Sequence, residues 1–125
     1  MKQVPRSPIG PRTDKQVTGH AGEDDALAHL GQQGLTLVAR NFRCKCGEID
    51  LIMRHGDILV FIEVRKRAKS LFGGAAASVT HAKQARLIMT AQIYLQRYRT
   101  PPACRFDVIA IDGAQLTWLK NAIEA

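Results

Sequence analysis

Two carboxylates occur in successive strand-like segments of the chain, Asp50 within GEIDLIMR and Glu63 within DILVFIEVRK. The residues that join these segments, His55 to Asp57, are typical of a tight hairpin turn. With Gly56-Asp57 as the turn the two carboxylates face each other directly, and with His55-Gly56 they are diagonal neighbours. Either turn puts both carboxylates on one face of the hairpin, whereas a three-residue loop would put them on opposite faces.

Glu48 and Arg65 share that face under the same two-residue turn. Ionised carboxylates on neighbouring strands repel each other, and a bound divalent cation removes the repulsion. We therefore expect Asp50 and Glu63 to be ligands of Mg²⁺ or Mn²⁺, which would activate water beside a phosphodiester. The alternative is a solvated sheet face on which the two side chains are merely exposed.

A third carboxylate, Glu23, lies in a helical segment and points toward the interior. It precedes Leu27 by four residues and Leu30 by seven, so it shares their apolar face. A carboxylate on the buried side of a helix is unusual and indicates a specific role.

The charge distribution predicts an anionic partner. The chain has 125 residues and a net charge of +7, and the stretch between Val64 and Phe106 holds no Asp or Glu. Such a basic surface fits a nucleic-acid backbone first and an anionic membrane surface second. We predict a nucleic-acid partner, with DNA as the expected one. Because aromatic residues are few, we expect phosphate contacts and shape recognition in place of base stacking. The predicted contact residues are Lys66, Arg67, Lys69, Lys83 and Arg86.

These residues need a layered α/β scaffold. Residues 1–17 read as a disordered basic arm, and residues 18–125 as a single domain. Hydrophobic periodicity predicts the order α-β-β-β-α-β-β, a mixed sheet flanked by helices. The expected helices span 18–33 and 78–98, and the expected strands span 35–43, 47–54, 57–66, 105–111 and 115–119.

The remaining candidates favour structural roles and a cytoplasmic protein. Cys44 and Cys46 could supply two zinc ligands, but the sequence offers no second pair, so incidental reduced thiols are the preferred interpretation. Asp107, beside Arg105 on an apolar strand, is interpreted as a structural, ion-paired residue. We expect a cytoplasmic protein without a membrane segment, since no signal-peptide pattern or long apolar run occurs.

The motifs GEIDLI and FIEVRKR, together with Gly22-Glu23, Asn41, FGGAAASVT, Lys83 and RFDVIAI, resemble those of the bacterial YraN family. The likeness runs from Gly19 to the C-terminal end. It implies a restriction-endonuclease-like fold with a site of the PD-(D/E)XK type, related to archaeal Holliday junction resolvases. Such proteins act on branched or duplex DNA and form dimers, so the resemblance also implies a possible homodimer.

The resemblance assigns catalytic roles to four positions. Glu23 matches the acid of the first helix, Asp50 the central aspartate and Glu63 the acid of the E-x-K step, while Arg65 occupies the lysine position. Arginine stays charged and cannot act as a base, although it can stabilise negative charge. Three functions therefore remain open: a metal-dependent DNA hydrolase, a catalytically silent DNA-binding adaptor, and a basic module for an acidic protein or lipid surface.

Overall fold

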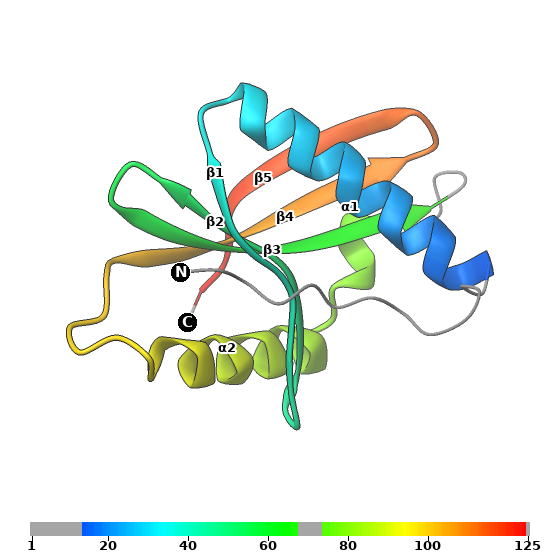
Figure 1. Cartoon of the computed structure of the whole chain (residues 1–125). Helices are drawn as coiled ribbons and strands as arrows, with labels where there is room; N and C mark the ends of the chain where they lie inside the picture. The colour runs from blue at the N-terminus through cyan, green and yellow to red at the C-terminus, as the bar shows by residue number, and fades with distance from the viewer. Residues whose placement is uncertain (1–13, 68–73, 125) are drawn as a thin grey trace.

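The computed structural model describes residues 14–67 and 74–124 and confirms the predicted order of elements. Two helices and five strands form a mixed α/β fold, with a short 3₁₀ helix before the second α-helix (Figure 1). The elements are α1 (Asp14–Gln32), β1 (Thr36–Cys44), β2 (Gly47–His55), β3 (Ile58–Arg67), η1 (Ala76–Ser78), α2 (His81–Leu95), β4 (Cys104–Asp112) and β5 (Gln115–Ile123).

The five strands form one sheet in the order β1-β2-β3-β4-β5. Strands β3 and β4 run parallel, and the other neighbouring pairs run antiparallel. A parallel pair needs a crossover connection, which α2 supplies. Figure 1 shows α1 lying across one face of the sheet and α2 across the other.

Each helix covers its own hydrophobic cluster, so the sheet is the middle of three layers. Ala26 and Leu30 of α1 pack on one face, and Leu87, Ala91 and Tyr94 of α2 pack on the other. Burial of these side chains stabilises each layer by roughly 25 cal/mol for each Å² of apolar surface removed from water. The sheet contributes Leu51, Met53, Val60, Ile62, Ile109 and Ile111 to the first cluster, and Ile49, Ile52, Leu59, Phe61, Phe106 and Val108 to the second.

The hairpin between β2 and β3 has the two-residue turn on which the sequence argument depends. His55 pairs with Ile58, so Gly56 and Asp57 form the turn. Gly56 has φ of +62°, a left-handed conformation that glycine adopts without steric cost. The pairing continues to Leu51 and Ile62, and one further residue along this register places Asp50 opposite Glu63.

Four predicted boundaries are wrong by three residues or more, one of them the end of α2, which lies at Leu95 instead of residue 98. Helix α1 begins at Asp14 instead of residue 18, and residues 1–13 of the predicted arm lie outside the described residues. Helix α2 begins three residues later than predicted because the Thr80 hydroxyl caps it, accepting a hydrogen bond from the backbone N–H of Lys83. Strand β5 continues to Ile123 because a bulge in β5, between Leu119 and Ile123, lets the strand pair again with Phe106 of β4.

Candidate functional site

The β2–β3 ladder ends where the predicted carboxylates begin. Beyond the last pair, Leu51 with Ile62, the backbone N–H of Val64 donates to Asp50 Oδ2 at 2.8 Å. The charge of Glu63 is also close enough to raise the pKa of Asp50. The structure therefore places Asp50 and Glu63 side by side, as the two-residue turn predicts.

Glu23 reaches the same place from α1. The preceding residue, Gly22, packs against the Lys66 side chain of β3, and a Cβ at Gly22 would lie 3.4 Å from this side chain. Glu23 itself is only 8% exposed. Its Oε1 accepts hydrogen bonds from Asn41 Nδ2 at 3.0 Å and from Arg40 Nη2 at 3.4 Å. A carboxylate on the buried side of α1 is thus held by donors from β1.

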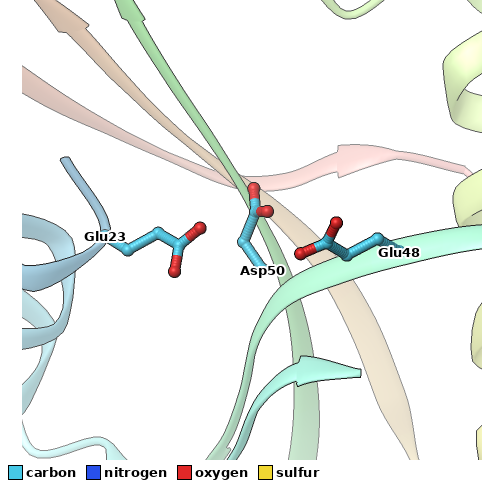
Figure 2. A group of neighbouring side chains, drawn as sticks. All are labelled: Glu23, Glu48 and Asp50. Carbon is cyan, nitrogen blue, oxygen red and sulfur yellow. The ribbon is translucent and has the colours of Figure 1, made fainter. Parts of the chain in front are cut away.

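Three carboxylates converge at this point, and one of them was not among the predicted site residues. One oxygen each of Glu23, Glu48 and Asp50 lies within 4.8 Å of the other two. In Figure 2, Glu23 and Glu48 approach Asp50 from opposite sides. Sequence analysis placed Glu48 on the shared face but not in the site. Its spacing of two residues from Asp50 was the available signal.

Repulsion among these carboxylates changes their ionisation. The pKa of Asp50 is raised well above its ordinary value. Burial is the largest cause, and the negative charge of Glu63 is the second largest. Glu23 and Glu48 raise the pKa further, and the hydrogen bond from Val64 opposes the shift. Burial also raises the pKa of Glu63, against the opposing effects of the positive charges of Arg65 and Lys83. The group is therefore short of positive charge.

Arg65 is the nearest compensating cation. Its Nη2 lies 2.6 Å from Glu63 Oε2, while its buried Nε has no hydrogen-bond partner among the residues that the structure describes. Arg65 thus pairs with Glu63 through Nη2, and its Nε–H remains able to donate a hydrogen bond to a further acceptor. Its positive charge is also the main cause that lowers the pKa of Lys83.

A pocket of about 340 Å³ joins the acidic group to part of the predicted basic surface. Lys83 and Arg86 of α2 line it together with Arg65 and the four carboxylates. Lys66 and Arg67 lie on β3, where the Lys66 side chain packs against Gly22 and Arg67 is exposed. Lys69 lies outside the described residues. The pocket is therefore acidic toward β2 and α1 and basic toward α2.

The donor set fits a hard divalent cation. Carboxylate oxygens are the ligands that Mg²⁺ and Mn²⁺ prefer, and a cation would relieve the repulsion that raises the pKa of Asp50. The cysteines take no part in this group. Cys44 Sγ donates to Thr90 Oγ1 at 3.8 Å and accepts from the backbone N–H of Cys46, and all three thiols are free.

Comparison with known proteins identifies the family. The sequence pattern of the uncharacterised protein family UPF0102 matches residues 22–111. This chain belongs to that family. The match confirms the predicted relationship to the YraN family, and the matched range includes Glu23, Asp50, Glu63, Arg65 and Lys83.

Bacterial UPF0102 proteins are similar to this chain over nearly its whole length. One from Herminiimonas arsenicoxydans is 66% identical over 115 residues, which cover 92% of this chain and 93% of the relative. Another, from Janthinobacterium sp. (strain Marseille), is 68% identical over 117 residues, or 94% and 95% of the two chains. No helix in the described part of this UPF0102 chain is long and apolar enough to cross a membrane.

Proposed function

We propose that this UPF0102 protein binds duplex or branched DNA in the pocket and hydrolyses a phosphodiester bond with Mg²⁺ or Mn²⁺. The observation that carries the proposal is the pairing of opposite charges in one pocket: a carboxylate group on α1 and β2 faces Lys83 and Arg86 of α2. In such a pocket a phosphodiester can bind a cation held by the carboxylates and, at the same time, the lysine and arginine side chains on the other side.

Asp50 is the central cation ligand in this proposal, with Glu63 as the predicted second ligand. Glu48 and Glu23 add oxygens to the donor set, since they approach Asp50 within 4.8 Å. When bound, the cation would polarise the phosphoryl group and lower the pKa of a bound water. The chain's own carboxylates would hold the cation and its bound water in place.

The basic wall of the pocket supplies the contacts to phosphate. Lys83 and Arg86 bind phosphate oxygens, and Arg65 offers its unpaired Nε to an oxygen that gains negative charge. Attack by water forms one bond to phosphorus as the bond to the leaving oxygen breaks. Because Arg65 keeps its proton, the proton of the attacking water passes to a carboxylate or to solvent. A second copy of the chain, bound two-fold, would suit a branched substrate.

One observation favours a second candidate function, a DNA-binding adaptor without cleavage. The 2.6 Å ion pair with Arg65 engages Glu63, one of the two predicted cation ligands. A lysine could leave this ion pair as a neutral amine, whereas an arginine cannot. In the adaptor the basic wall still binds DNA, and the carboxylates only shape the pocket.

A cleavage panel separates the two candidates. Junctions, flaps, duplexes, single strands and RNA are incubated with the wild type, Asp50→Asn and Arg65→Lys, each with Mg²⁺ and with Mn²⁺. We expect the wild type to cut a DNA substrate, Asp50→Asn to bind DNA without cutting, and Arg65→Lys to keep part of the activity. If neither the wild type nor Arg65→Lys cuts any substrate, the adaptor replaces the hydrolase. Cleavage by Asp50→Asn at the wild-type rate would remove the proposed site.

A further inference from the structure

Asn41 interrupts the regular course of β1 at the position opposite Asp50. Its neighbours Arg40 and Phe42 pair with Leu51 and Ile49, so the register places Asn41 across the ladder from Asp50. Asn41 has φ of +52°, in the left-handed region that few residues other than glycine and asparagine adopt readily. This conformation re-aims the side chain relative to that of a regular strand residue.

The re-aimed side chain contacts Glu23. Asn41 Nδ2 donates to Glu23 Oε1 at 3.0 Å, which is the shorter of the two bonds to this oxygen. Arg40 Nη2 lies 3.4 Å from the same oxygen but is closer to Asp24, at 2.9 Å, so its charge is shared. Of the two donors from β1, the one closer to Glu23 is therefore a neutral amide.

A neutral donor suits a carboxylate that has to stay negative. Glu48 and Asp50 lie within 4.8 Å of Glu23 and repel it when all three are ionised. A lysine or arginine in place of Asn41 would hold Glu23 but would also supply the charge that the group otherwise takes from a cation. The amide of Asn41 holds Glu23 in position and leaves the net charge of the group unchanged.

We propose that Asn41 is a positioning residue of this site, which holds Glu23 beside Asp50 and Glu48 so that the three carboxylates bind a divalent cation together. The inference rests on the proposed function, because it assumes that a cation binds this group. It adds to that function a residue on β1 that touches neither the cation nor the substrate. Hydrogen bonds from outside the ligand shell orient metal-binding side chains in this way.

The test compares two asparagines with the same backbone conformation. Asn41→Gly removes the amide and keeps a residue that tolerates positive φ, and Asn121→Gly does the same on β5, where φ is also +52°. Mn²⁺ affinity is measured by electron paramagnetic resonance with MnCl₂ alone. We expect Asn41→Gly to weaken binding by about 10- to 100-fold and Asn121→Gly to leave it unchanged.

A double-mutant comparison shows whether Asn41 acts through Glu23. In a Glu23→Gln background, we expect Asn41→Gly to cause no further loss of Mn²⁺ affinity, which a general structural defect would not produce. Wild-type Mn²⁺ affinity in Asn41→Gly, or a further loss in the Glu23→Gln background, overturns the positioning role and leaves the proposed function standing. A wild type that binds no Mn²⁺, either with MnCl₂ alone or after duplex DNA is added, overturns the cation site itself, and Asn41 is then a structural residue only.

Discussion

Asp107 on β4 and Asp50 on β2 are both shielded carboxylates, and their surroundings differ in charge. Asp107 is fully buried and accepts four hydrogen bonds, two of them from Arg105 Nε at 3.0 and 3.2 Å. The others come from Trp118 Nε1 at 2.9 Å and from the backbone N–H of Asn121 at 2.8 Å. The chain itself supplies the hydrogen-bond donors and the positive charge that compensate this buried carboxylate. The ion pair with Arg105 that the sequence predicts is therefore present, in keeping with a structural role.

Asp50 has the opposite surroundings. One backbone N–H donates to it, and its charged neighbours are the carboxylates of Glu23, Glu48 and Glu63. Arginine is present in both regions, but Arg65 pairs with Glu63 and not with Asp50. Proteins that bury charge without a binding role pair it internally, as at Asp107. The contrast supports the proposal that the charge of Asp50 is completed by a partner from outside the chain.

The same substitution should therefore have opposite effects on stability at the two positions. Asp107→Asn replaces a carboxylate by an amide whose NH₂ faces donors, and it leaves Arg105 without its counter-charge. We expect a loss of about 3–5 kcal/mol in the free energy of unfolding, measured by urea denaturation. A loss below the typical value of about 1 kcal/mol for single substitutions would show that the Asp107 network is not a structural centre.

Asp50→Asn should stabilise the protein when divalent cations are absent. The amide oxygen can still accept from Val64, and the substitution removes one charge from a group of mutually repelling carboxylates. We expect the free energy of unfolding at pH 8 in EDTA to rise by about 1 kcal/mol. Most single substitutions change stability by a similar amount, but they lower it. A loss of stability would mean that the chain already compensates the charge of Asp50.

The difference between wild type and Asp50→Asn should also depend on pH. Because the folded-state pKa of Asp50 is raised, the folded protein holds a proton that the unfolded chain releases. This proton contributes fully to the free energy of unfolding at pH values below the ordinary pKa of an aspartate. The contribution is lost as pH rises through the raised pKa of Asp50. Unfolding in EDTA at a series of pH values checks this, and a difference that shrinks with rising pH contradicts it.

The smallest predicted effect distinguishes the basic residues of the two regions. Lys83 lines the pocket, whereas Lys120 lies over the Trp118 ring, 4.4 Å from its centroid, beside the Asp107 network. We expect Lys83→Ala to reduce the slope of log affinity for duplex DNA against log salt by about 1. Lys120→Ala serves as the matched control and should leave the slope unchanged. Equal changes in both variants would remove the pocket from the DNA-binding surface.

The sequence was sufficient to predict the element order and the carboxylate pair, because both depend on short-range patterns. The Gly56-Asp57 turn sets the register of β2 and β3, and helical spacing directs Glu23 toward the sheet. The start of α1 at Asp14 could not be predicted in this way, since residues 14–17 carry little apolar periodicity.

The facing of β2 and the contribution of Asn41 depend on features that no local pattern specifies, whereas the spacing of Glu48 from Asp50 was a local signal. Ile49 belongs to the cluster under α2 and Leu51 to the cluster under α1, although residues two apart in a regular strand share a face. Strand β2 therefore changes its facing at Asp50, which regular alternation along the strand does not predict. Asn41 has a left-handed backbone and contacts Glu23, a residue 18 positions away in the chain.

Mn²⁺ binding tests the difference between the two aspartates most directly. The titration uses electron paramagnetic resonance in the presence of duplex DNA, because substrate phosphates complete the coordination of weakly held cations. We predict that the wild type binds Mn²⁺ in the pocket, that Asp50→Asn loses this binding, and that both bind DNA. Equal Mn²⁺ binding by the two proteins, or none by the wild type, would contradict the account.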